Sequence, residues 1–76
     1  MIKILFFAQL QEEIGASITY EGSPGTVQDI KDYVEQLYPH ISLTSTMVAV
    51  NEQFATSTDI VNAGDEVAFL PPVSGG

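Results

Sequence analysis

The 76-residue sequence contains no cysteine, no tryptophan, one histidine and only two basic side chains. Without cysteine the chain has neither a disulfide framework nor a thiolate nucleophile, and a cytoplasmic setting fits best. Ten acidic residues against Lys3 and Lys31 give a formal net charge of −8, which repels nucleic acid and anionic lipid. We therefore expect basic or apolar protein partners, no nucleic acid and no membrane.

Long apolar runs are also missing. The opening run of residues 2–10 is interrupted by Lys3 and Gln9 and is far shorter than a membrane span, so we expect neither a signal peptide nor a transmembrane helix. The length allows one domain, residues 1–76, with one modest core. With 45% hydrophobic residues the chain can bury that core.

The sequence also lacks a set of residues that could form a catalytic, metal or phosphate site within the chain. His40 follows Pro39 in an expected loop and has no obvious second metal ligand. Glu12 and Glu13 are adjacent, so they point in diverging directions on a helix and do not form an acid/base pair. No lysine follows the glycines as a phosphate-binding loop would require. We expect a protein that is not catalytic on its own, with no metal site and no tightly bound cofactor.

The first third of the chain is predicted to form two strands separated by a short helix. Residues 2–8 are β-branched and aromatic, with Ile2, Ile4 and Phe6 on one face of the strand and Leu5 and Phe7 on the other. Residues 9–15 carry two apolar residues four apart with a glycine just beyond, which is typical of a short helix and its end. Residues 17–21 alternate and lead into a cluster of turn formers, which predicts the second strand.

One clear amphipathic helix follows. Thr26 begins it as an N-cap, with its hydroxyl accepting from the amide of Asp29, and Pro39 ends it. Apolar residues recur at helical spacing and predict the face that packs on the core, with Tyr33 or Tyr38 beside it. These residues are Val27, Ile30, Val34 and Leu37.

The second half of the chain predicts three more strands. Residues 47–50 and 53–55 are joined by a turn at Asn51, and residues 66–70 form the last strand. The order of elements describes an α+β fold, a mixed sheet packed on one main helix. A ubiquitin-like β-grasp satisfies it if the first and last strands lie parallel at the sheet centre, because the helix supplies the crossover that parallel strands need.

The open face of such a sheet should be polar, but here it is apolar. If Ile2, Ile4, Phe6, Val67 and Phe69 face the helix, another set must face away. That set contains Leu5, Phe7, Ala68 and Leu70, joined by Phe54. Scattered apolar surface residues are normal, so this face is either a partner surface or ordinary surface.

The chain ends in a tail, residues 71–76, that finishes on two glycines and a free carboxylate. Pro71 and Pro72 fix φ and donate no hydrogen bond, which stops the last strand and favours an extended, stiff spacer. Gly75 and Gly76 can enter a channel too narrow for other residues, so the Gly76 carboxylate is the candidate reactive group. The alternative is a frayed terminus without a function.

Two stretches together resemble a known family. Residues 4–10, Ile-Leu-Phe-Phe-Ala-Gln-Leu, and the ending Phe-Leu-Pro-Pro-Val-Ser-Gly-Gly look like the small subunits of molybdopterin synthase, the MoaD type of ubiquitin-like sulfur carriers. The likeness covers the whole chain. A bare Gly-Gly end would equally suit the sulfur carrier of thiamine thiazole synthesis or a ubiquitin-like protein modifier.

The resemblance implies a β-grasp fold and a carrier cycle. An E1-like enzyme uses ATP to adenylate the Gly76 carboxylate, a sulfur donor protein converts it to a thiocarboxylate, and the tail gives its sulfur to cyclic pyranopterin monophosphate in the large subunit. That step forms the molybdopterin dithiolene of molybdenum cofactor biosynthesis. The resemblance also implies a heterotetramer of two small and two large subunits.

By the same resemblance, several residues take partner-facing positions: Phe7, Phe54, Leu70, Pro71, Pro72, Val73 and Ser74. Gln11 departs from the family pattern, in which arginine often stands, so an ion pair with the partner at that point is not expected. Against the carrier stand two other interpretations, a modifier joined to lysines through Gly76 and an interaction domain with a passive tail.

Overall fold

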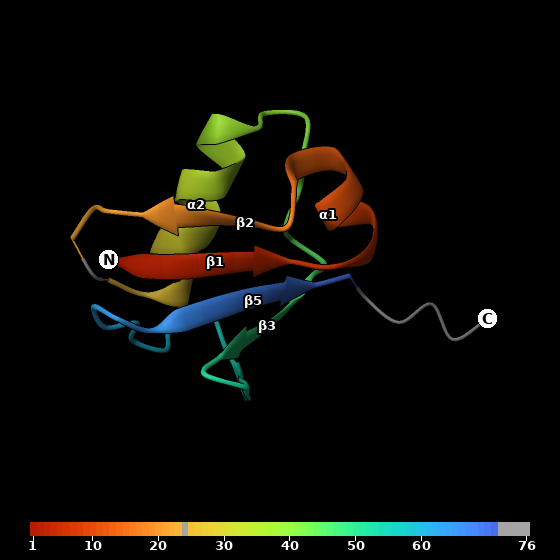
Figure 1. Cartoon of the computed structure of the whole chain (residues 1–76). Coiled ribbons are helices and arrows are strands. Elements are labelled where there is room, and N and C mark those ends of the chain that lie inside the picture. The colour runs from red at the N-terminus through yellow and green to blue at the C-terminus, as the bar shows by residue number, and fades with distance from the viewer. Residues whose placement is uncertain (24, 72–76) are drawn as a thin grey trace.

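The computed structural model describes residues 1–23 and 25–71, and Figure 1 shows the arrangement of its elements. The elements in chain order are β1 (Ile2–Phe6), α1 (Ala8–Ile14), β2 (Ser17–Tyr20), α2 (Val27–Leu37), β3 (Met47–Val50), β4 (Gln53–Ala55) and β5 (Glu66–Leu70). Every strand and helix expected from the sequence is present. The expected flexible Gly-Gly tail, apart from Pro71, lies outside the described residues.

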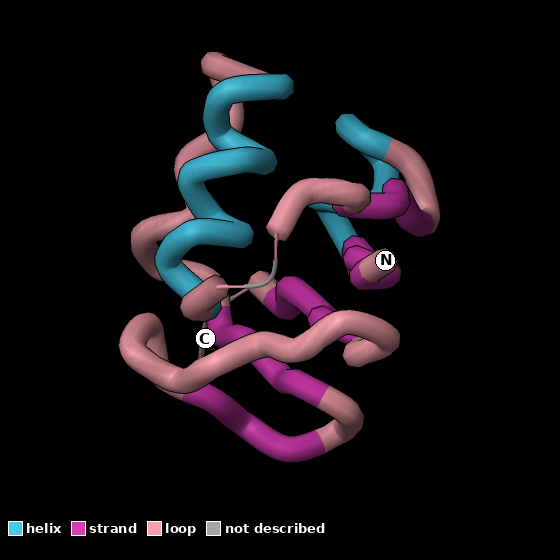
Figure 2. Tube along the Cα trace, turned by 90° about the vertical axis from the view of Figure 1, so that its left-hand side faces the viewer, coloured by secondary structure: helices cyan, strands magenta, loops and turns pink. Residues whose placement is uncertain are grey.

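The five strands form one mixed sheet in the order β2-β1-β5-β3-β4. β1 and β5 pair in parallel, whereas the other three pairs are antiparallel. Figure 2 shows α2 on one side of this sheet, where it forms part of the connection that parallel strands require. The prediction of a ubiquitin-like β-grasp with the first and last strands parallel in the interior of the sheet is confirmed.

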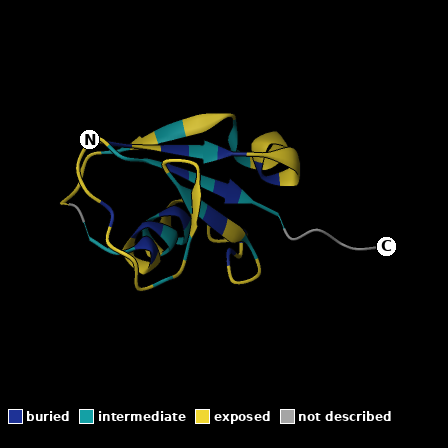
Figure 3. Cartoon of the chain, turned by 90° about the horizontal axis from the view of Figure 1, so that it is seen from below, coloured by how far each residue is buried: buried dark blue, intermediate teal, exposed yellow. Residues whose placement is uncertain are grey.

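The core lies between α2 and the sheet, and the buried residues in Figure 3 gather there. Thirteen buried apolar residues form it: Ile2, Ile4, Phe6, Leu10, Val27, Ile30, Val34, Ile41, Leu43, Val48, Val61, Val67 and Phe69. The rings of Phe6 and Phe69 stack with their centroids 6.0 Å apart across the parallel pair. The alternation predicted for the first and last strands is therefore correct.

The start of α2 follows the predicted local chemistry. The Thr26 hydroxyl accepts a hydrogen bond from the Asp29 amide at 3.2 Å, and the Asp29 carboxylate accepts one from the Thr26 amide at 2.9 Å. This capping box satisfies two amides that the first turn leaves without helical partners. The Asp29 charge also lies at the positive end of the helix dipole.

The end of α2 differs from the prediction. Leu37 was expected to continue the apolar stripe, but its side chain is 49% exposed. Ile41 and Leu43 from the following loop are buried with Val34 in the same cluster, so the loop closes this end of the core. The Glu35 carboxylate accepts a hydrogen bond from the Leu43 amide at 2.8 Å and holds the loop against the helix.

The first strand is shorter than predicted. β1 ends at Phe6 instead of residue 8, because the chain turns into α1 immediately afterwards. Phe7 is the N-cap of α1, and Ala8 has a positive φ of 53°. Gly15 follows the helix with a φ of 121°, a conformation that glycine adopts at little cost. None of the helices in the described residues is both long enough and apolar enough to span a bilayer.

Candidate functional site

The candidate site begins with β5, the strand that leads to the chain end. β5 lies between β1 and β3, so both of its edges are hydrogen-bonded. Leu70 and Pro71, which follow the buried Phe69, are half-buried. The last described residue is thus attached to the interior of the sheet, which gives the terminal segment a rigid base.

The other end of β5 is held by a polar turn. The Asp65 carboxylate accepts hydrogen bonds from the Asn62 amide at 2.8 Å and from the Asn51 side chain at 3.0 Å. These bonds, the one from the Asn62 amide first, lower the pKa of the Asp65 carboxyl below its ordinary value. The Asn51 side-chain oxygen also accepts from the Glu66 amide at 3.0 Å. The β3–β4 hairpin turn therefore fixes the start of β5.

The sheet face opposite α2 is apolar on β1, β5, β3 and β4 in the row that contains Leu5, whereas β2 contributes a serine to that row. The next row on the same face, Thr19, Lys3 and Glu66, is polar, so the predicted apolar face is confined to the side of the sheet where β5 ends. The register places the residues of the first row side by side: Ser17, Leu5, Ala68, Ala49 and Phe54. Each lies next in sequence to a residue on the helix-facing side, as strand alternation requires. Phe54, at the β4 end of this row, is 73% exposed.

A second group of large apolar side chains lies beside this row. Leu70 pairs with Met47 across β5 and β3, and Phe7 follows the last pair of β1 with β5. Phe7 is 41% exposed and Met47 40% exposed. We call Phe7, Met47, Phe54 and Leu70 the open-face patch. It lies on the sheet beside the point where the chain reaches Pro71.

The structure brings together three of the predicted partner-facing residues. The strand register places Phe54 and Leu70 on the open face, and Pro71 follows Leu70 directly. Phe7 follows the buried Phe6 with an extended backbone, φ −127° and ψ 159°, so the alternation of β1 directs it to the same face. The other predicted site residues lie outside the described part of the chain; they are Pro72, Val73, Ser74, Gly75 and Gly76. Gln11, where the sequence departs from the family pattern, is exposed on α1.

Sequence reasoning missed Met47. The signal was available, because a strand that buries Val48 must direct Met47 to the opposite face. His40, which was given no ligand role, is exposed in the loop after α2. Within the described ranges, no three His, Cys, Asp or Glu side chains gather as a metal site would require. The geometry thus places an apolar surface beside the base of the terminal segment.

Comparison with known proteins agrees with this geometry. The model of the ThiS family matches residues 4–76, nearly the whole chain. The chain belongs to the ThiS family. One curated relative, the molybdopterin synthase sulfur carrier subunit of Haemophilus influenzae, is 35% identical, with 100% of each chain covered. The protein of the same name from Dictyostelium discoideum is 37% identical, with 97% of this chain and 94% of that one covered. The resemblance to the small subunits of molybdopterin synthase is thus confirmed.

A solved structure confirms the fold. SAMP1 from Haloferax volcanii superposes with a TM-score of 0.78 at 28% identity, with 99% of this chain and 98% of that one covered. A second crystal structure, of small archaeal modifier protein 1 from the same organism, has a TM-score of 0.77 at 25% identity and covers 95% of this chain and 97% of the other. The family and its fold neighbours therefore include both sulfur carriers and proteins named as modifiers.

Proposed function

We propose that this ThiS-family protein is the sulfur-carrying small subunit of a molybdopterin synthase. The observation that carries the proposal is the agreement between the family match, which reaches Gly76, and full-length relatives named as sulfur carrier subunits of that enzyme. The open-face patch beside Pro71 supports the proposal, because a partner that binds the tail would lie next to this apolar surface.

In the proposed cycle the reactive group is the Gly76 carboxylate. An E1-like enzyme transfers AMP from ATP to this carboxylate and releases pyrophosphate. Sulfur that a donor protein supplies at the sulfide level then attacks the acyl carbon, displaces AMP and leaves a thiocarboxylate. The small protein needs no catalytic residue of its own for these steps, since it supplies the acyl group while its partners supply the acids, bases and nucleophiles.

The large subunit is the proposed acceptor of the charged tail. The thiocarboxylated tail would enter the active site of the large subunit and transfer its sulfur to cyclic pyranopterin monophosphate. The dithiolene contains two sulfurs, so two charged carriers would have to bind in turn. The open-face patch would bind the large subunit, with each large side chain contributing about 2 kcal/mol on full burial. The subunit name of the relatives supports such a heteromer, and a 2+2 heterotetramer is part of the proposal.

A second function is favoured by a specific observation. The fold neighbour from Haloferax volcanii is named as a small archaeal modifier protein, and it is 25% identical to this chain. A modifier would use the same activated Gly76 but would transfer it to lysine amines. A carrier for thiamine thiazole synthesis would share the thiocarboxylate and differ only in the acceptor.

One experiment separates these functions. The purified full-length protein is incubated with an E1-like enzyme of the family, ATP and a sulfur source, and its intact mass is measured. Exchange of one oxygen for sulfur supports the carrier, and dithiolene formation after adding the large subunit and the pyranopterin substrate supports the molybdopterin pathway. Ladders on other proteins without sulfur gain would support the modifier, and an unchanged mass would exclude both.

A further inference from the structure

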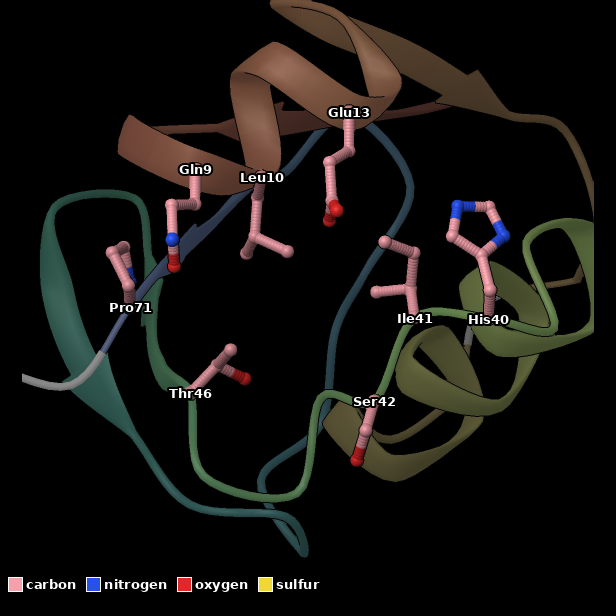
Figure 4. Close-up of a pocket in the computed structure, with 8 residues that line it drawn as sticks. All are labelled: Gln9, Leu10, Glu13, His40, Ile41, Ser42, Thr46 and Pro71. Carbon is pink, nitrogen blue, oxygen red and sulfur yellow. The ribbon is translucent and has the colours of Figure 1, made fainter.

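A hollow of about 190 Å³ lies beside the base of the terminal segment, and no residue of the open-face patch lines it. We call it the tail-base pocket; its main walls are Gln9, Leu10 and Glu13 of α1, Ile41 and Thr46 of the loop before β3, and Pro71. Figure 4 shows Leu10 and Glu13 directed from α1 into this hollow, with Ile41 opposite them and Pro71 at one side. Segments from both ends of the chain and its middle therefore build one pocket.

The floor of the pocket is apolar. Leu10 is only 7% exposed and Ile41 only 6% exposed, so both are fixed in the core and present their outer atoms to the hollow. Pro71 adds a rigid apolar wall. Such a floor suits the aliphatic part of a long basic side chain. Lysine and arginine pack their methylene groups along apolar surface, and their charged groups would stay at the rim of the pocket.

The rim carries hydrogen-bond acceptors. Glu13 brings a carboxylate, and Gln9 brings an amide oxygen. The Thr46 hydroxyl donates its proton to the Leu43 carbonyl at 2.6 Å, so its oxygen is left as an acceptor. Acceptors around an apolar floor match a group that donates hydrogen bonds and accepts none, and guanidinium and ammonium groups are cationic groups of this kind.

Local electrostatics also favour a cation here. Glu13 lies in the last turn of α1, where the helix dipole is negative, and no basic residue accompanies it in that turn. His40 stands on the rim and is the other titratable group that lines the pocket. An incoming cation would therefore meet a carboxylate that no basic residue in the last turn of α1 neutralises.

We propose that the tail-base pocket receives an arginine side chain of the enzyme that activates the tail. The identity of this partner rests on the proposed function, in which an E1-like enzyme activates the Gly76 carboxylate. Five residues separate Pro71 from the chain end, so the pocket lies within roughly 17 Å of the carboxylate along the chain. The net charge of −8 favours partners with basic surfaces, and Glu13 places one carboxylate in the pocket itself. Arginine fits better than lysine, because its planar fork can bond the carboxylate through two N–H groups.

The pocket itself is tested on the full-length protein without any enzyme. N-acetyl-arginine-N-methylamide is titrated while the methyl resonances of Leu10 and Ile41 are followed by NMR, with the uncharged citrulline analogue as the comparison. We expect saturable shifts with the arginine compound, lost in Glu13→Gln and retained in Glu12→Gln, its neighbour outside the pocket. Equal shifts with citrulline, or unchanged shifts in Glu13→Gln, would overturn the proposal. Proximity of the Val73 methyls to Leu10 in nuclear Overhauser spectra would overturn it too, because the chain's own tail would then be the occupant.

The partner is tested with the activating enzyme. We expect Glu13→Gln to raise the KM for the carrier about threefold to tenfold with kcat unchanged, since a partly covered ion pair contributes to binding and not to the chemistry. Glu12→Gln should leave KM within about twofold. Equal effects of the two variants would overturn the assignment of Glu13. If the wild-type protein gains no sulfur, the proposed function and the named partner fail together, whereas the arginine titration judges the pocket by itself.

Discussion

Met47 on β3 is the cross-strand partner of Leu70 on β5, and both lie on the sheet face opposite α2. Their sequence neighbours Val48 and Phe69, which also pair, are buried on the helix side. One register thus specifies a core pair and a surface pair in adjacent positions. The surface pair, beside Pro71, extends the predicted patch by a residue that the sequence had not singled out.

The first prediction concerns binding through this patch. Phe7→Ser should weaken the complex with a molybdopterin synthase large subunit at least tenfold, because a large apolar contact is lost on a surface of few anchors. Serine is also a favourable N-cap, so α1 should keep its stability. Isothermal titration calorimetry measures the affinity, and the midpoint of urea unfolding measures the fold.

The matched control for that prediction is Leu37→Ser. Leu37 is 49% exposed, close to the 41% of Phe7, and lies on α2, on the other side of the sheet from the open-face patch. It should leave the affinity nearly unchanged. An equal loss of affinity in both variants would show that general surface hydrophobicity, and not the patch, carries the binding.

The second prediction tests the alternation in β5. Phe69→Ala should lower the free energy of unfolding by about 3 to 5 kcal/mol, since it removes a buried ring that stacks on Phe6. Leu70→Ala, one residue on, should cost much less, because its side chain is only half-buried. Chemical denaturation compares the two. A larger loss for Leu70→Ala would mean that the faces of the strand are assigned the wrong way round.

These two predictions rest on features that the sequence already reveals. Period-two patterning identified the buried faces of β1 and β5, and the N-cap of α2 followed from Thr26 and Asp29. The burial of Ile41 and Leu43 could not be predicted, because irregular backbone has no period and only tertiary packing decides which of its side chains enter the core. The exposure of Leu37 has the same cause.

The candidate site, like the fold, could be predicted only in part from the sequence. The apolar excess on one sheet face could be counted from alternation, and the Gly-Gly ending could be read directly. The tail-base pocket could not be found that way, since Glu13 and Pro71 are far apart in the chain and meet only through the fold. The two residues are close because β1 and β5 are neighbours in the sheet. α1, which carries Glu13, follows β1, and Pro71 follows β5, so both lie at the same edge of the sheet.

The third prediction concerns acid stability. The folded-state pKa of Asp65 is depressed, so the ionised form stabilises the fold above the ordinary pKa, and this contribution is lost as the pH falls through the lowered value. The difference in unfolding free energy between wild type and Asp65→Asn should therefore be constant above about pH 4 and should change only below it. The asparagine variant keeps an acceptor but cannot titrate. A difference that stays constant down to about pH 2 would contradict the assignment.

The last prediction concerns the Gly76 carboxylate. Adding one alanine after Gly76 leaves every core residue in place, so the free energy of unfolding should change by well under about 1 kcal/mol. Sulfur transfer should nevertheless be lost. The carboxylate moves one residue along the chain, roughly 3.3 Å, and it gains a Cβ where the activating site is expected to accept only glycine. A displacement of about 1 Å can already cost 10²-fold in rate.

The matched control for this extension adds the same residue at the other end of the chain. An alanine placed before Met1, which is 71% exposed, leaves Gly76 as the terminal residue, so this variant should retain thiocarboxylate formation within a few-fold of the wild type. Intact mass after incubation with the activating enzyme, ATP and a sulfur source measures both variants, and dithiolene yield with the large subunit gives a second readout. Equal yields from the wild type and the alanine-extended protein would overturn the carrier function, because the sequence has no cysteine that could hold the sulfur in place of the terminal carboxylate.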